Sequence, residues 1–231
     1  MALFNKTATA QTSLRALARL LGYPDAELRA NLGDVREALH RESALSAPRL
    51  AELDSLIGSL ERAAPLAAEA DYVDLFDRGR STSLHLFEHV HGDSRDRGPA
   101  MIDLAQTYEK AGLYLAEGEL PDYLPVVLQF TSTQPPREAR AFLGEMAHIF
   151  NAIFAALQGR HSAYAAVLGA LLELAGETAQ PVKIVADEPM DAVWEEPVVF
   201  DGCSTKGQAK PGTPQPVHIV RKERLVKGNH V

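Results

Sequence analysis

The sequence predicts an all-helical fold, a bundle of about eight or nine helices followed by an irregular C-terminal tail. Apolar residues recur at helical spacing in nearly every segment up to Ala175, and the alternation typical of strands is hard to find. The links between these segments are short, as in a helical bundle. From Glu177 onward prolines recur and the helical period is lost. We therefore expect a helical domain at residues 1–176 and a Pro/Gly-rich, largely irregular tail at residues 177–231.

The first four helices are expected over residues 14–21, 28–39, 48–60 and 65–76. Gly22 and Pro24 end the first of them. Pro48 and Pro65 fit the first turns of the third and fourth, because the N–H that proline lacks would have no partner inside a first turn. The proline positions therefore support the boundaries that the apolar period indicates.

The later helices are expected to follow the same pattern. A charged turn after residue 76 leads into another helical segment near residues 84–91, and Pro99 begins the next helix. Asp122 is predicted to cap a helix that runs to Phe130, its carboxylate accepting from the first-turn N–H groups. The strongest amphipathic run, residues 142–157, is predicted to be one helix, and residues 164–172 form the last.

The tail offers only short patterns. Residues 182–185, 198–200 and 217–220 are apolar fragments, compatible with small strands or with extended segments on the bundle. Residues 202–212 are typical of a flexible linker. Cys203 lies in this stretch, so we interpret it as a loop thiol and not as a nucleophile. The chain ends in a basic segment at residues 221–227.

Composition excludes several classes of protein. The net charge of −8 argues against nucleic-acid binding, which needs a basic face, and suits a basic partner. The single cysteine rules out an internal disulfide. The N-terminus lacks the apolar run of a signal peptide, and the longest uncharged apolar run, residues 163–172, is too short to span a bilayer. These features predict a cytoplasmic protein without a transmembrane segment.

One motif suggests an enzyme. Residues 85–89 match H-x-x-E-H, and on a helix His85 and His89 would face the same way, as two zinc ligands must. Glu88 and His91 also match half of a carboxylate-bridged iron site. However, no acidic motif nominates a third zinc ligand, and there is no second Glu/His helix. A metal-dependent hydrolase using His85, Glu88 and His89 is therefore the alternative to a binding protein without a metal.

Two segments are poorly explained by packing alone. Residues 72–89 end one helix in a charged, polar turn and start another. Residues 119–130 hold Pro121 and Pro125, which fix the backbone tightly. This loop would present Glu119, Asp122 and Tyr123 at the entrance of a helix.

Together these segments resemble the NarJ/TorD-type maturation chaperones of molybdenum oxidoreductases, most closely the nitrate reductase (NarJ, delta subunit) branch. The resemblance is carried by residues 20–24, 72–89, 119–125 and 216–221. Tyr123 and Gln129 depart from the histidine and the acid that the family often has there. The resemblance implies a non-enzymatic chaperone that binds the N-terminal segment of an apo catalytic (alpha) subunit. It also implies support for insertion of molybdopterin guanine dinucleotide before membrane docking, with no cofactor held stably.

An amphipathic peptide would require an apolar groove with carboxylates at its rim. Seven residues are nominated for the apolar and aromatic wall: Tyr72, Phe76, Leu84, Leu86, Leu120, Tyr123 and Leu124. Glu119, Asp122 and Asp77 are nominated for the rim, and Pro121 shapes the end of the site together with Glu119 and Asp122. A helical regulatory adaptor with a different partner is a second alternative, and both a monomer and a weak dimer remain open.

Overall fold

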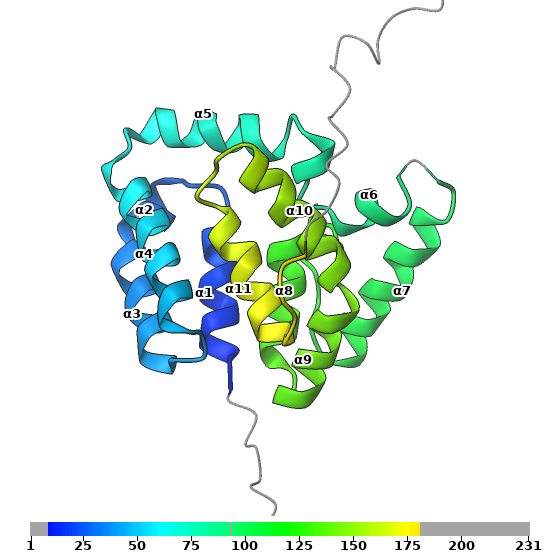
Figure 1. Ribbon diagram of the computed structural model, residues 1–231. Helices are drawn as coiled ribbons and strands as arrows, with labels where there is room; N and C mark the ends of the chain where they lie inside the picture. The colour runs from blue at the N-terminus through cyan, green and yellow to red at the C-terminus, as the bar shows by residue number, and fades with distance from the viewer. Residues whose placement is uncertain (1–8, 93, 181–231) are drawn as a thin grey trace, which may run out of the picture. The chain divides into compact units, whose positions relative to one another are not determined.

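The computed structural model describes residues 9–92 and 94–180, which belong to the first of the two units of the chain, Met1–Asp187 (Figure 1). The described part contains eleven α-helices and one short 3-10 helix: α1 Gln11–Leu20, α2 Ala26–Ala30, α3 Leu32–Glu42, α4 Ala47–Arg62, α5 Pro65–Phe76, η1 Arg80–Thr82, α6 Leu86–Val90, α7 Arg97–Lys110, α8 Leu124–Thr133, α9 Pro136–Glu145, α10 Ala147–Gly159 and α11 Ala165–Ala175. No strand occurs in these residues, so the predicted all-helical fold is confirmed.

Helix α1 lies in the middle of the bundle. It packs against α8 on one side and α3 on the other, and α11 packs against α4, α9 and α10 (Figure 1). Leu14, Leu17 and Leu20 of α1 are all fully buried, and burial of each such side chain stabilises the fold by about 1.5–3 kcal/mol. The leucine face read from the sequence is therefore the core-facing stripe of the central helix.

Proline marks helix boundaries as predicted. Pro48 lies in the first turn of α4, Pro65 begins α5, and Pro136 begins α9 directly after the end of α8. The predicted start at Pro99 is two residues late, because α7 begins at Arg97. These residues end or begin helices because they cannot donate the backbone hydrogen bond that an internal position needs.

Two predicted helices are each broken into two, which explains why the sequence predicted too few. The expected helix over residues 28–39 divides at Asn31, which ends α2 and precedes α3. The expected helix over residues 142–157 divides at Met146, where α9 and α10 meet with a bend of 62°. The bend lets α9 pack on α8 while α10 packs on η1 and α6. Tertiary packing thus overrides an unbroken apolar period.

No single helix among the described residues is long and apolar enough to cross a membrane. The bent pair of α9 and α10 reaches the required length and composition only when the two are counted together.

The last described helix ends at Ala175, where Gly176 adopts the left-handed conformation with φ +84°. The predictions for the three apolar fragments, the linker, Cys203, the basic end and the family element at residues 216–221 all lie outside the described residues. The domain division at residues 176/177 therefore stays a prediction.

Candidate functional site

A hollow of about 480 Å³ opens where four segments meet. The segments are the turn after α1, the C-terminal end of α5, the chain just before α6 and the loop before α8. We call it the aromatic hollow, and its lining residues are Tyr23, Tyr72, Phe76, Asp77, Leu84, His85, Gly118, Glu119, Leu120 and Tyr123. Seven of the eleven residues nominated from the sequence are among them.

The floor of the aromatic hollow is a cluster of aromatic rings, of which Tyr72 and Phe76 are buried. The ring centroids of Tyr72 and Phe76 lie 4.8 Å apart, and Tyr23 meets Tyr72 edge-on at 5.6 Å. The Tyr72 hydroxyl donates to the carbonyl of Leu21 at 2.7 Å. Burial raises the pKa of Tyr72, so this phenol stays protonated and neutral. The floor is therefore apolar, and its Tyr72 hydroxyl already has a hydrogen-bond partner.

The two sequence blocks that carry the family resemblance meet at this hollow. His85 and Tyr123 form an isolated antiparallel bridge, with backbone hydrogen bonds from Leu86 to Asp122 (3.0 Å) and from Leu124 to Leu84 (2.8 Å). The Tyr123 hydroxyl lies 3.3 Å from that of Tyr72. The bridge holds the loop before α8 against the start of α6, which fixes one wall of the hollow.

The predicted role of Asp122 is wrong. Helix α8 begins at Leu124, its N-cap is Tyr123, and no side chain caps it. The Asp122 carboxylate, which is fully buried, instead accepts from the backbone N–H of Phe87 in the first turn of α6 at 3.2 Å. Asp122 thus accepts from the first turn of α6, a helix that precedes it in the chain, and is not a carboxylate at the rim of the hollow.

Three other nominated residues also lie in the interior and do not line the hollow. Leu86 and Leu124 are buried in the main core. Pro121 is buried as well, and its carbonyl accepts from the Tyr108 hydroxyl at 2.8 Å. These residues hold the wall in place and do not form its surface, because their side chains are buried.

The rim retains two of the predicted carboxylates. Asp77 and Glu119 are exposed, and the Glu119 carboxylate accepts from the backbone N–H of Ala116 at 3.2 Å. Leu120 beside them is 44% exposed. No lysine or arginine belongs to the described lining of this hollow. Its rim is therefore acidic and partly apolar.

The expected helical pairing of His85 and His89 is wrong, because His85 precedes α6. The Nδ1 atom of His85 lies 3.4 Å from the Asp122 carboxylate, which raises the pKa of His85. His89 Nε2 lies 2.8 Å from the carbonyl of Ser83, and Glu88 pairs with Arg97. Within residues 9–92 and 94–180, no group of three His, Cys, Asp or Glu side chains is placed to hold a metal ion.

Tyr23 and His85 are lining residues that the sequence did not nominate as binding residues. Tyr23 lies in the quoted segment 20–24, between the end of α1 and Pro24, and its 46% exposure is unusual for a large aromatic residue. The position of Tyr23 directly after a buried helix was the sequence signal that could have indicated a binding residue.

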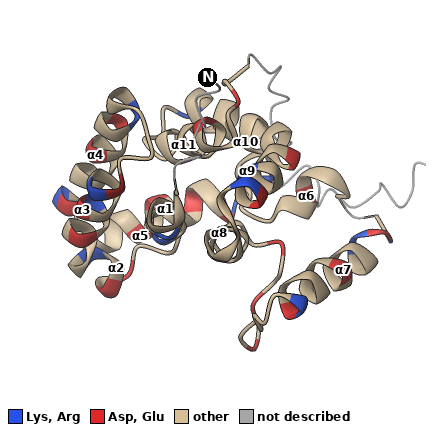
Figure 2. Ribbon diagram, turned by 90° about the horizontal axis from the view of Figure 1, so that it is seen from below, with Lys and Arg blue, Asp and Glu red and all other residues tan. Residues whose placement is uncertain are grey.

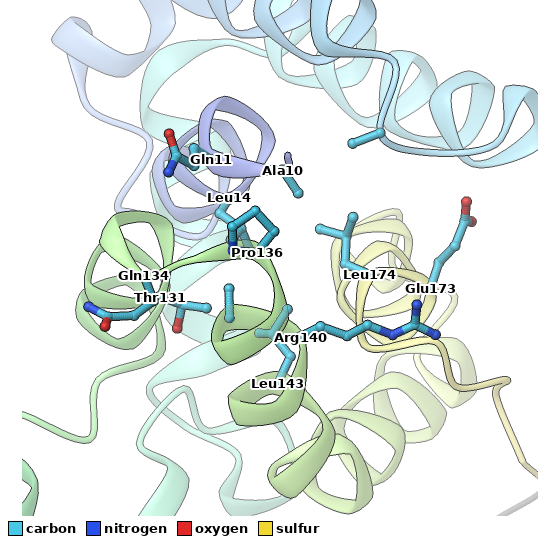
Figure 3. A pocket seen from close by; sticks show the side chains of 12 residues that line it. Ala10, Gln11, Leu14, Thr131, Gln134, Pro136, Arg140, Leu143, Glu173 and Leu174 are labelled. Atoms are coloured by element: carbon cyan, nitrogen blue, oxygen red, sulfur yellow. The ribbon is translucent and has the colours of Figure 1, made fainter. Parts of the chain in front are cut away.

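A separate, smaller pocket lies near the other end of α1. It has a volume of about 150 Å³, and Ala10, Gln11 and Leu14 of the α1 region line it. Figure 3 shows Arg140 extending from α9 towards Glu173 of α11. The Arg140 Nε donates to the carbonyl of Ala175 at the end of α11, so this arginine caps a helix. None of the nominated residues lines this pocket.

The fold has a counterpart among solved structures. A protein from Archaeoglobus fulgidus described as a redox enzyme maturation protein has a similar fold, with a TM-score of 0.52 at 20% identity over 77% of this chain and 100% of that one. The chain belongs to the nitrate reductase delta subunit family, whose model matches residues 37–169.

Two curated relatives support this assignment. The nitrate reductase molybdenum cofactor assembly chaperone NarJ of Escherichia coli (strain K12) is 43% identical over 190 residues, which cover 78% of this chain and 80% of that protein. A Bacillus subtilis (strain 168) protein named as a NarJ assembly chaperone is 34% identical over 169 residues, covering 72% of this chain and 89% of that protein. The predicted family is confirmed. The names of these relatives describe assembly factors, which favours a chaperone over a metal-dependent hydrolase.

Proposed function

We propose that this protein is a system-specific chaperone for a respiratory nitrate reductase. It binds the apo catalytic subunit in the cytoplasm and supports insertion of the molybdenum cofactor before the subunit docks at the membrane. The names of its NarJ relatives support the general role. The finer proposal is that the N-terminal segment of the catalytic subunit binds in the aromatic hollow.

One observation carries this finer proposal: an aromatic floor and an acidic rim occur in the same open hollow. Aromatic floors bind apolar side chains over a large area. Carboxylates at the edge of such a floor pair with lysine or arginine. The hollow therefore suits an amphipathic, basic peptide that lays its apolar face on the exposed side chains of Tyr23 and Leu120, which stand over the buried aromatic floor. Its cations would lie beside Asp77 and Glu119.

A chaperone of this kind acts by differential binding, because it can hold only those states of the client in which the segment is accessible. Folding of the finished subunit would withdraw the segment and release the chaperone. The chaperone need not contact the cofactor for this to work. In this proposal it supports insertion by keeping the client in an unfinished state, and it holds no cofactor stably.

Titration calorimetry with a synthetic peptide of the catalytic subunit's N-terminal segment tests the binding site. Glu119→Gln and Asp77→Asn together are expected to weaken binding about 3–10-fold, and more at low salt, because rim ion pairs contribute about 0.2–1 kcal/mol each. Leu120→Ala should weaken binding by a similar factor. Leu66→Ala is the matched control, since Leu66 is 77% exposed and lies in the first turn of α5, outside the hollow.

Unchanged affinity in both hollow variants would exclude this site. The adaptor alternative is separated by co-purification of the full-length chain from its native host. A maturation chaperone brings down an apo-oxidoreductase subunit, whereas an adaptor brings down another partner.

A further inference from the structure

A second hollow lies on the other side of the loop that precedes α8. It has a volume of about 510 Å³, and α1, α8 and the segment from the end of α7 to Glu119 line it. We call it the arginine groove, because Arg15 and Arg19 of α1 form part of its wall. Glu119 lines both this groove and the aromatic hollow, so the two are neighbours.

The floor of the arginine groove is a small apolar cluster of its own. Tyr108, Val126 and Phe130 are buried together, apart from the main core, with the rings of Tyr108 and Phe130 4.6 Å apart. Tyr108 is the one fully buried residue of α7, which lies at the edge of the bundle, away from α2, α3 and α4 (Figure 1 and Figure 2). The floor therefore exists because this one tyrosine anchors α7 and its following loop on α8.

The rim of the groove carries an exposed aromatic residue. Tyr114 is 80% exposed, and Leu113 and Leu115 on either side of it are only half-buried. Gly112 and Gly118 bracket this stretch with φ of +78° and +86°, a conformation that favours glycine. Tyrosine and arginine beside an apolar floor are the residues most enriched at the centres of protein interfaces. The composition therefore fits a polypeptide ligand.

The α1 wall of the groove carries two arginines, unlike the acidic rim of the aromatic hollow. Arg15 and Arg19 are exposed and one helical turn apart. The Arg15 Nε donates to the Ser132 hydroxyl at 3.1 Å, which orients the guanidinium, and Arg15 makes no ion pair within the described part of the chain. Arg19 pairs with Glu27 at 2.9 Å. On a protein with a net charge of −8, Arg15 is therefore the cation of this wall that has no carboxylate partner among the described residues.

We infer that the arginine groove binds a second stretch of the same client, one that carries aspartate or glutamate beside apolar side chains. This inference rests on the proposed function. Carboxylates would form bidentate pairs with the guanidinium of Arg15, and apolar side chains would pack on the exposed Tyr114 beside the buried apolar floor. Glu119 repels the acidic stretch and attracts the basic one. It therefore favours the basic stretch in the aromatic hollow and leaves the acidic stretch to the arginine groove.

The client fits this groove better than a second copy of the chaperone does. The two hollows meet at Glu119, so one polypeptide can cross from one to the other. Once the basic stretch is bound, the acidic stretch is held at a high effective concentration, and a weak contact suffices to occupy the groove.

Photo-crosslinking of the full-length chain to the apo catalytic subunit tests where the client lies. p-Benzoylphenylalanine replaces Tyr114 in one variant, Leu120 in a second and the remote Leu66 in a control. We expect position 114 to crosslink to an acidic, apolar stretch of the client and position 120 to a different, basic stretch. Crosslinking at position 114 no stronger than at position 66, or to a stretch without carboxylates, would overturn the inference.

Charge reversal supplies the second measurement. Arg15→Glu is expected to weaken binding of the apo subunit about tenfold and to leave binding of the isolated basic peptide unchanged. Arg137→Glu is the matched control, because Arg137 is exposed on α9, makes no ion pair among the described residues and lies outside both hollows.

The outcomes separate the two proposals. If the wild-type chain fails to bind the basic peptide in the aromatic hollow, the finer part of the proposed function fails. If the peptide binds normally and Arg15→Glu has no more effect than Arg137→Glu, the inference about the groove alone fails. Loss of a dimer in Arg15→Glu, seen by sedimentation without any change in client binding, would assign the groove to a second copy and also overturn it.

Discussion

Replacing the buried Asp122 by alanine should destabilise the protein strongly, although this residue lies in a loop. Its carboxylate accepts from the backbone N–H of Phe87 at 3.2 Å and lies 3.4 Å from His85 Nδ1. Arg97 approaches to 3.8 Å. Alanine would remove the hydrogen-bond acceptor of Phe87 and His85 and the ion-pair partner of Arg97 at once, while leaving these groups in place.

The magnitude follows from these contacts. Loss of a helix N-cap costs about 0.5–2 kcal/mol. A partly buried donor left without its acceptor costs about 1–3 kcal/mol. The two effects share one carboxylate and are not fully additive, so we expect a loss of about 2–4 kcal/mol in the free energy of unfolding. That is a large part of the roughly 5–15 kcal/mol that stabilises a typical domain.

Urea unfolding followed by circular dichroism measures this loss. With a slope of about 1–3 kcal/mol/M, the midpoint should fall by about 1 M or more. Asp122→Asn should lie between the wild type and Asp122→Ala, because it keeps an acceptor for Phe87 but loses the charge facing His85. Asp77→Ala is the control, since Asp77 is exposed in the same hollow and its loss should stay within about 0.5 kcal/mol. A loss below about 1 kcal/mol in Asp122→Ala, or an equal loss in Asp77→Ala, would refute the reasoning.

Three further predictions rest on single groups. The hydrogen bond with Asp122 raises the pKa of His85, with Glu88 adding to the rise and burial and Arg97 opposing it. NMR titration should therefore place the pKa of His85 above the value of about 6.5 for a free imidazole, and Asp122→Asn should lower it. Folding raises the pKa of His85, so the stability that His85 contributes relative to His85→Gln should be fully present below about pH 6.5. This stability should fade as the pH rises through the folded-state pKa. A stability difference between the two proteins that grows with pH would contradict this. Tyr72→Phe should cost about 1–3 kcal/mol in urea unfolding, because the buried Leu21 carbonyl loses its donor, and an unchanged midpoint would show that another donor replaces the hydroxyl. Gly176→Ala should lower the unfolding free energy by about 1–2 kcal/mol, because φ of +84° is unfavourable for alanine and the new Cβ would overlap the guanidinium of Arg140, which must move. Gly144→Ala, with nothing within 4 Å of its Cβ, is the matched control and should not destabilise the protein.

The sequence was a good guide to the helices and a poor guide to their breaks. Pro48 and Pro65 act locally, because a missing N–H constrains the first turn wherever the helix packs. The break at Met146 has no such local cause. Gly144 lies close to it, but one glycine inside a helical pattern is tolerated and does not predict a break. The bend depends on what α9 and α10 each pack against, which the apolar period of one segment does not contain.

The site was predictable to a similar extent. The resemblance nominated the two blocks that meet at the His85–Tyr123 bridge. It did not reveal which side chains face outward there, and Asp122 shows why. A carboxylate just before a helix has the local signature of an N-cap for that helix, yet its acceptor is used by α6, 35 residues earlier in the chain. Arg15 and Arg19 were not predicted to line a groove, because a groove made by three distant segments leaves no local pattern.

The loop between the two hollows has a consequence for release of the client. It is anchored on one side by the Tyr108 hydroxyl, which donates to Pro121, and on the other by the backbone bond from Leu86 to Asp122. Both anchors hold residues that follow Glu119 closely in the chain, so the loop is already fixed before the client binds, and little ordering cost opposes binding. If two linked stretches of the client occupy the two hollows, their contributions multiply in the affinity. Withdrawal of either stretch by folding of the client then removes most of the affinity at once, so release follows completion of the client and needs no change of shape in the chaperone.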